Sequence, residues 1–239
     1  MDPETFRVLV VCTGNLNRSA LGAALLRTWA DWYLPGELAG RVVVSSAGLA
    51  APAGRPMRRR TQAIAERLGA DGHGHRARQV DEAQVRSADL VLAADVAHRD
   101  GVLGLVPSML RSSYTIREAG AIATALGVAA VPQSVAELRA RIALLSDRRS
   151  LGTAGDGDIT DPQGKDDEAF RAMAREEVPP LAALAALLFG MPRGEVEAVG
   201  AIVADPDAFP FEGLGPSSER GSGGSAERPR RRWFGRRDS

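Results

Sequence analysis

Short runs of aliphatic and β-branched residues alternate with longer segments of helical periodicity, and this alternation restricts the fold more than any other feature of the chain. Four runs predict buried strands, at residues 7–11, 41–45, 89–93 and 113–116. The segments between them carry apolar residues at helical spacing, most clearly over residues 20–33. Strands that alternate with helices predict an α/β fold, a doubly wound three-layer sandwich with a four-stranded parallel sheet.

A loop with the sequence Cys-Thr-Gly-Asn-Leu-Asn-Arg-Ser, residues 12–19, joins the first predicted strand to the first helix. Ligands of doubly wound sheets bind at such strand-to-helix turns. A thiolate is favoured for Cys12 at a helix N-terminus near Arg18, and Arg18 offers phosphate a planar pair of donors. Gly14 relaxes the backbone of the tight curve, and Ser19 can donate to the thiolate or cap the helix. We therefore expect a phosphate-binding loop after the first strand; a buried structural cysteine is the alternative.

The bulk properties exclude several classes of partner and location. The 30 basic and 30 acidic residues give zero formal charge, which predicts no nucleic-acid partner. One cysteine excludes an intramolecular disulfide and fits a reducing compartment. The N-terminus is charged, and the longest apolar run, residues 181–191, is too short to span a bilayer. We expect a cytoplasmic protein without a transmembrane segment.

The composition changes near residue 193, which suggests a domain boundary. Gly, Pro, Ser and Glu dominate residues 193–225, and residues 226–239 hold six arginines against two acidic residues. We expect a single domain over residues 1–192 and a disordered tail over residues 193–239. The basic C-terminal end of this tail could contact acidic surfaces.

The loop and several later segments resemble the low-molecular-weight protein tyrosine phosphatase family in its bacterial form. The family signature C-x-G-N-x-C-R-S is similar to residues 12–19. Further segments match in the family's order over residues 7 to about 190. They are Val-Ser-Ser-Ala-Gly at 44–48, His-Arg-Ala-Arg-Gln at 75–79, Ala-Asp-Leu-Val-Leu at 88–92, Tyr-Thr-Ile-Arg-Glu at 114–118 and Ile-Thr-Asp-Pro at 159–162.

The resemblance implies a cysteine-dependent phosphomonoester hydrolase that forms a cysteinyl-phosphate intermediate. Cys12 would attack phosphorus, Arg18 would bind the oxygens, and Asp161 would protonate the leaving group and then deprotonate water. The implied substrates are phosphorylated proteins, above all phosphotyrosine, or small phosphate esters, and no metal or other cofactor is implied. The other implied residues bind phosphate (Thr13, Gly14, Asn15, Leu16, Asn17 and Ser19) or support the loop (Ser46 and His75).

The chain departs from the family pattern in its pocket. Asn17 stands where the family has a second cysteine, so a protective disulfide with the nucleophile is not expected. Gln163 stands where aromatic residues would wall the site, which removes stacking on a phenyl ring. Leu16 is closer to the isoleucine of the tyrosine-directed branch than to the threonine of the arginine-phosphate branch. The segment 118–157 is longer than compact members need, and residues 134–145 predict an inserted helix in it.

Several alternatives remain open. A non-catalytic module that binds phosphate or phosphoproteins would share the loop, although the joint presence of Cys12, Arg18 and Asp161 favours an enzyme. An arginine phosphatase of the same fold is possible, whereas an arsenate reductase would need further cysteines. Asp156 and Asp158 compete with Asp161 as the proton donor, and the proline after Asp161 favours the latter.

Overall fold

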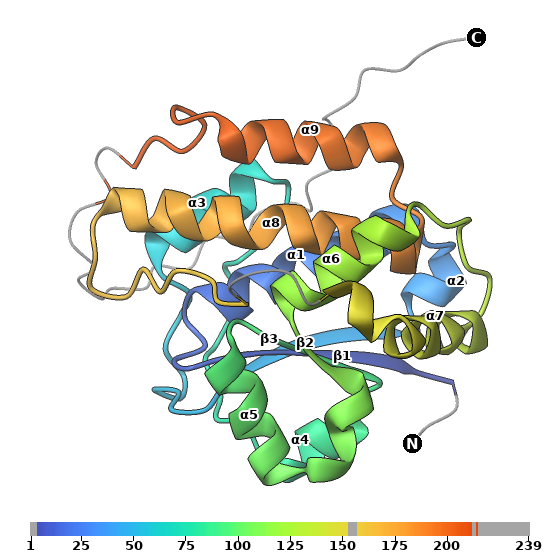
Figure 1. Ribbon diagram of the computed structural model, residues 1–239. Helices are drawn as coiled ribbons and strands as arrows, with labels where there is room; N and C mark the ends of the chain where they lie inside the picture. Colours follow the sequence, from blue (N-terminus) through green and yellow to red (C-terminus); the bar gives the residue numbers. More distant parts are fainter. Residues whose placement is uncertain (1–3, 153–156, 212–213, 215–239) are drawn as a thin grey trace, which may run out of the picture.

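The computed structural model describes residues 4–152, 157–211 and 214, and it confirms the α/β sandwich (Figure 1). One sheet of four parallel strands has the order β2-β1-β3-β4. The strands are β1 (Phe6–Cys12), β2 (Val42–Gly48), β3 (Leu90–Ala93) and β4 (Ser113–Thr115). All four predicted runs are therefore strands, with some ends shifted.

The central position of β1 explains its unbroken aliphatic sequence. Val8 and Val10 belong to the larger apolar core on one face of the sheet, whereas Leu9 and Val11 belong to the smaller core on the other face. Alternate side chains of a strand point to opposite faces, so a parallel strand covered on both sides needs apolar residues at every position. The strand ends at Cys12, at the carboxyl edge of the sheet.

Helices cover both faces of the sheet (Figure 1). On the smaller core lie α4 (Glu82–Ser87) and α5 (Val96–Leu105). The larger core is formed with α1 (Arg18–Tyr33), α3 (Arg59–Arg67), α6 (Ile116–Leu126), α7 (Val135–Asp147) and α8 (Asp167–Phe189). The short elements are α2 (Gly36–Ala39) and the 3₁₀ turns η1 (Pro107–Ser112) and η2 (Arg149–Gly152).

Two helices test the sequence interpretation of the second half of the chain. The helix expected over residues 134–145 is α7, and the Ser134 side chain caps it. α8 continues through Pro179 and Pro180, although proline in a helix interior usually interrupts or bends the helix. Each proline removes a helical hydrogen bond, but α6 packs directly on the pair: a Cβ on Gly120 would lie 2.2 Å from the Pro180 Cβ. This close packing of α6 supports α8 at the point where its helical hydrogen bonds are missing.

The predicted tail is wrong for its first part, because residues 193–211 are structured. α9 (Arg193–Ala204) packs on α8 and forms an outer layer above it (Figure 1). Beyond α9, Phe209 and Phe211 are 2% and 3% exposed. Composition hides this segment because α9 is rich in small and charged residues and contributes a narrow apolar stripe, with only Val203 fully buried.

The arginine-rich end of the chain, residues 226–239, lies outside the described residues. Within the described part, no helix combines the length and the apolar character that crossing a membrane requires.

The carboxyl edge of the sheet is the part of this fold that positions a site, because four strand ends and the starts of α1 and α5 meet there.

Candidate active site

The turn from β1 into α1 forms the loop that the sequence predicts as phosphate-binding. Cys12 is 3% exposed, and its Sγ lies 2.9 Å from the Ser19 hydroxyl and 3.3 Å from the Asn15 N–H. Both groups can donate to the sulfur, and donors aimed at an anion stabilise it. Ser19 therefore serves the thiol and does not cap the helix, since α1 begins at Arg18 with Asn17 in the N-cap position.

Asn15 determines the curvature of this loop. Its φ of +52° is the only positive φ of a non-glycine residue in the described chain, and asparagine tolerates this region better than most residues. Its side chain donates to the Ser19 hydroxyl at 2.9 Å and accepts from the Arg78 N–H at 3.0 Å. The curve expected at Gly14 thus lies one residue later, because Gly14 is not in the left-handed region.

His75 supports the loop from the following segment. Its Nε2 lies 2.7 Å from the Asn15 carbonyl oxygen, to which it donates. Burial lowers the pKa of His75, and the contact with the Asn15 carbonyl offsets this only in part, so the ring is neutral at pH 7 with its hydrogen on Nε2. Ser46, the other predicted support, is buried in β2 opposite Val10, and its contact with the loop stays a prediction.

The end of β2 lies against the loop at backbone distance. A Cβ on Gly48 would be 2.3 Å from the Thr13 carbonyl oxygen, so only glycine fits without a shift of the backbone. Immediately after β2, the Ala50 N–H donates to the same Thr13 carbonyl at 2.9 Å. The Ser-Ala-Gly segment of the second strand therefore forms one wall of the loop.

Arg18 lies behind the loop and is 4% exposed. Its Nη1 donates to the Ile159 carbonyl at 3.1 Å and to the Asp95 carboxylate at 3.3 Å, while its Nη2 donates to the Asp161 carboxylate at 2.8 Å. One edge of the guanidinium is thus fixed by Ile159 and Asp95, and the other faces Asp161. The Asp161 side chain is 44% exposed, so this ion pair stands at the boundary between interior and solvent.

The acidic loop residues take different positions. Asp161 faces Arg18, and its other carboxyl oxygen accepts from the Gln163 N–H at 3.0 Å. The Asp158 carboxylate instead accepts from the Val96 N–H, at the start of α5, at 3.0 Å. Asp156 lies outside the described residues. Of the two described acids, Asp158 and Asp161, only Asp161 contacts Arg18.

A buried chain of polar groups joins Asp95 to the loop, and sequence reasoning missed it. Asp95 caps α5, and its carboxylate lies 2.6 Å from His98 Nδ1. His98 Nε2 lies 2.7 Å from the hydroxyl of Thr13, the residue directly after Cys12. Burial lowers the pKa of His98, and the Asp95 charge opposes this shift. The available signal was the position of Asp95 just after the third strand, where sites form in such sheets.

Asn17 connects the loop to two other segments. Its Oδ1 accepts from the Thr61 hydroxyl at 2.8 Å, and its Nδ2 donates to Gln163 Oε1 at 3.4 Å. Leu16 is 7% exposed, and its carbonyl accepts from the Arg58 N–H at 3.1 Å. The two residues that depart from the family pattern, Asn17 and Gln163, therefore contact each other.

The assembled groups suit one type of chemistry. A buried thiol with two donors, a guanidinium, and a half-exposed carboxylate converge on one loop, and this combination can bind a dianion, attack it and transfer a proton. Among the described residues, no group of three or more His, Cys, Asp and Glu side chains is arranged to hold a metal ion.

Known proteins are similar to this chain in both sequence and fold. The profile of the family described as low molecular weight phosphotyrosine protein phosphatase matches residues 7–118. The probable low molecular weight protein-tyrosine-phosphatase EpsP of Ralstonia nicotianae is 35% identical over 111 residues, which are 46% of this chain and 70% of EpsP. A protein-arginine-phosphatase of Geobacillus stearothermophilus is 29% identical over 173 residues, 72% of this chain and 88% of that protein.

A solved structure extends the likeness to most of the described chain. The tyrosine phosphatase AmsI of Erwinia amylovora shares the fold with a TM-score of 0.55, at 21% identity, over 77% of this chain and 93% of that one. The profile match includes the whole loop from Cys12 to Ser19, as well as His75, Asp95 and His98. The chain therefore belongs to the low molecular weight phosphotyrosine protein phosphatase family, whose members are phosphoric monoester hydrolases.

Proposed function

We propose that this protein hydrolyses phosphomonoesters through a cysteinyl-phosphate intermediate, with protein phosphotyrosine as its substrate. One observation carries the proposal. Arg18 is buried behind the loop that begins at Cys12, and its Nη2 lies 2.8 Å from the half-exposed carboxylate of Asp161. We assign Cys12 as the nucleophile, Arg18 as the phosphate clamp and Asp161 as the proton donor, and the contact of Asp161 with Arg18 supports this assignment.

In the first step, the Cys12 thiolate attacks phosphorus. The S–P bond forms while the bond between phosphorus and the leaving oxygen breaks. The Ser19 hydroxyl and the Asn15 N–H hold the sulfur, and Arg18 binds the phosphoryl oxygens through its planar fork. Asp161, in its acid form, gives its proton to the leaving oxygen.

In the second step, water attacks the phosphorus of the cysteinyl phosphate. Asp161, now a carboxylate, accepts a proton from this water, the S–P bond breaks, and inorganic phosphate and the thiolate are released. The partial exposure of Asp161 gives water access to its carboxylate. The donors around the sulfur also make it a better leaving group, because they stabilise the thiolate that departs.

Phosphotyrosine is the first candidate substrate, and phosphoarginine is the second. Leu16 and the tyrosine phosphatase name of EpsP support the first. The arginine phosphatase match supports the second, because it extends over 72% of this chain against 46% for EpsP. Both substrates would use the same loop, so they differ only in the groups that contact the leaving side chain.

We also propose a cytoplasmic location, since the reaction needs Cys12 as a reduced thiol. The basic segment 226–239 offers six arginines for contact with acidic surfaces. Catalysis needs no contribution from that segment, because every group in the two steps above lies between Cys12 and Asp161.

Steady-state hydrolysis of para-nitrophenyl phosphate tests the mechanism. We expect turnover by the wild type in the presence of a chelator, none by Cys12→Ser, and a kcat about 10²–10⁴-fold lower for Asp161→Asn. Asp31→Asn, an exposed acid on α1, is the matched control and should behave as the wild type. A folded, reduced wild type without turnover would contradict the proposal, and parallel assays with phosphotyrosine and phosphoarginine peptides decide between the two substrates.

A further inference from the structure

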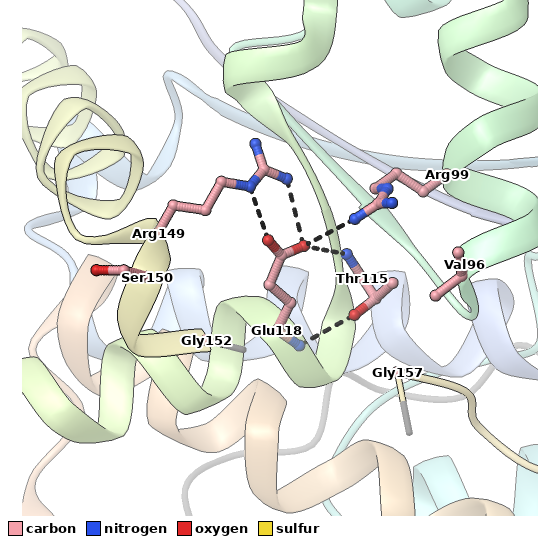
Figure 2. A pocket seen from close by; sticks show the side chains of 8 residues that line it. All are labelled: Val96, Arg99, Thr115, Glu118, Arg149, Ser150, Gly152 and Gly157. Carbon is pink, nitrogen blue, oxygen red and sulfur yellow. Dashed lines mark hydrogen bonds and ion pairs between the residues drawn. The ribbon is translucent and has the colours of Figure 1, made fainter. Parts of the chain in front are cut away.

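A pocket lies between the start of α5, the end of β4 and η2 (Figure 2). Its volume is about 400 Å³. Polar and charged side chains dominate its walls. The lining residues are Val96, Arg99, Thr115, Glu118, Arg149, Ser150, Gly152 and Gly157.

The pocket shares two of its walls with the active site. Val96 follows Asp95, whose carboxylate accepts from Arg18. Gly157 precedes the segment that contains Ile159 and Asp161, both of which contact Arg18. The four Cα–Cα steps from Gly157 to Asp161 span at most about 14 Å when fully extended. A peptide with its phosphorylated side chain at Arg18 therefore brings residues a few positions away within reach of the pocket.

The carboxylate that lines the pocket, Glu118, already pairs with Arg149. Figure 2 shows Glu118 between Arg149 and Arg99. Arg149 Nε donates to Glu118 at 2.7 Å, and its remaining nitrogens donate to the Leu110 and Ser113 carbonyl oxygens at 2.6 Å each. The Arg149 ring-face contact with Tyr114, at 4.3 Å from the ring centroid, fixes it further. Arg149 and Glu118 thus form a satisfied pair that attaches η2 to α6.

Arg99 is the cation that remains incompletely paired. Its Nη1 lies 3.6 Å from Glu118, a carboxylate that Arg149 already occupies, and its Nη2 lies 3.3 Å from the exposed Asp100. Its Nε is buried and has no hydrogen-bond partner among the described residues. Two arginines and one glutamate line the pocket, so the lining itself carries one excess positive charge.

We propose that this pocket binds a carboxylate side chain of the phosphoprotein substrate, from an acidic residue close to the phosphorylated one, with Arg99 as its partner. The inference rests on the proposed phosphotyrosine phosphatase function. A carboxylate matches the guanidinium of Arg99 in charge and geometry. The pocket volume of about 400 Å³ is large enough for such a side chain. A neutral side chain would gain no ion pair there.

Two sets of phosphotyrosine peptides test this site. They are identical except that positions two to four on either side of phosphotyrosine carry glutamate in one set and glutamine in the other. We expect the wild type to prefer the glutamate set by about tenfold in kcat/KM, the effect of one charge-assisted contact at a partly exposed site. Arg99→Gln should lose this preference, and Arg99→Lys should retain part of it. Turnover of para-nitrophenyl phosphate should stay the same in both variants.

Arg86→Gln is the matched control, because Arg86 is an exposed arginine on α4 that pairs with Glu82. It should keep the full preference for the glutamate set. Equal kcat/KM for the two sets in the wild type, or an unchanged preference in Arg99→Gln, would overturn the site. Turnover of para-nitrophenyl phosphate without turnover of either set would also overturn it and leave the hydrolase mechanism standing. Loss of all turnover in the wild type would instead remove the proposed function.

Discussion

At the scale of single residues, Asn15 shows how the loop is preformed. A left-handed conformation costs an ordinary residue about 1–2 kcal/mol, less for asparagine. Against this, Asn15 exchanges hydrogen bonds with Ser19, Arg78 and His75, each of which contributes about 0.5–1.5 kcal/mol. The balance favours the curved loop before any phosphate is present. The loop therefore does not have to change its curvature when a dianion binds.

A substitution of His98 leads to a prediction at the same scale. His98→Ala removes the partner of the Thr13 hydroxyl and the imidazole beside the Asp95 carboxylate, which keeps only Arg18 and the backbone N–H of residue 98. That carboxylate then competes more strongly with phosphate for the guanidinium. We expect kcat/KM for para-nitrophenyl phosphate to fall about tenfold, mainly through a higher KM. This corresponds to about 1.4 kcal/mol, one hydrogen bond of average strength.

The matched control for this variant is His73→Ala. His73 is exposed, and its ring lies beside the carboxylates of Asp71 and Glu66, so removal of the ring should change neither kcat nor KM. Thermal unfolding of both variants separates loss of fold from loss of binding. Unchanged KM in a folded His98→Ala protein would show that the Asp95–His98 pair does not act on Arg18.

Local spacing sufficed for the residues that share one contiguous loop, and the ordered match to the family's segments supplied His75 and Asp161, which contact the loop from elsewhere. Cys12, Arg18 and Ser19 lie within eight positions, so their spacing alone places them around one point. His98 lies 85 positions from Thr13 and belongs to none of the matched segments, and no local pattern encodes its contact with the loop. The same limit explains Gly14: composition suggested where the curve lies, but the contacts of Asn15 decide it.

At the scale of elements, the packing of α8 on α1 buries an acid. Glu177 is fully buried, and neither of its carboxyl oxygens makes a well-formed hydrogen bond with a described group. Gly22 of α1 makes room for it, since a Cβ there would lie 2.9 Å from Glu177 Oε1. Burial raises the pKa of Glu177 well above its usual range, and the Arg18 charge and the Gly22 N–H oppose this only in part. Burial therefore favours the acid form of Glu177 in the native protein.

The raised pKa makes stability depend on pH in a definite direction. Because native Glu177 holds a proton that the unfolded chain releases above about pH 4.3, stability falls as pH rises from there towards the native pKa. The loss is about 1.4 kcal/mol for each pH unit in that range. Glu177→Met replaces the acid by an apolar side chain of similar length and should flatten this slope. We expect the variant to be more stable than the wild type at pH 7, by urea unfolding.

The pH series supplies its own internal comparison for Glu177→Met. Near pH 4, where the wild-type group is protonated in both states, the gap in unfolding free energy should shrink. Glu197→Met, an exposed position on α9, should change stability by no more than about 0.5 kcal/mol at any pH. A gap that stays constant from pH 4 to pH 7 would mean that the Glu177 proton is not linked to folding.

Element types were predictable where a strong periodicity coincided with burial. The strands and α7 follow this rule, because an apolar run or stripe must face a core. α8 and α9 do not follow it. Packing of α6 on the Pro179–Pro180 pair overrides the helix-breaking tendency of proline, and α9 packs on a helix that already covers the core, so a narrow apolar stripe is sufficient.

At the scale of the whole molecule, residues 193–211 add an outer layer to the sandwich. Figure 1 shows α9 lying along α8 on the side away from the sheet. The Tyr33 hydroxyl of α1 bonds Glu195, and the Phe211 ring packs against Phe170, with centroids 6.2 Å apart. Arg171 donates to the Phe209 carbonyl at 3.2 Å. These contacts tie both ends of the layer to the catalytic domain.

Two truncations test whether this layer belongs to the folding unit. Removal of residues 193–239 deletes Phe209 and Phe211 and exposes the surface that they cover. The burial of these two side chains contributes about 3–6 kcal/mol together. We expect a loss of stability of that order in urea unfolding. Removal of residues 215–239 alone should leave both stability and para-nitrophenyl phosphate turnover unchanged, because it keeps every one of these contacts. Equal stability of the two truncated proteins would mean that α9 and its phenylalanines only rest on a domain that ends at residue 192.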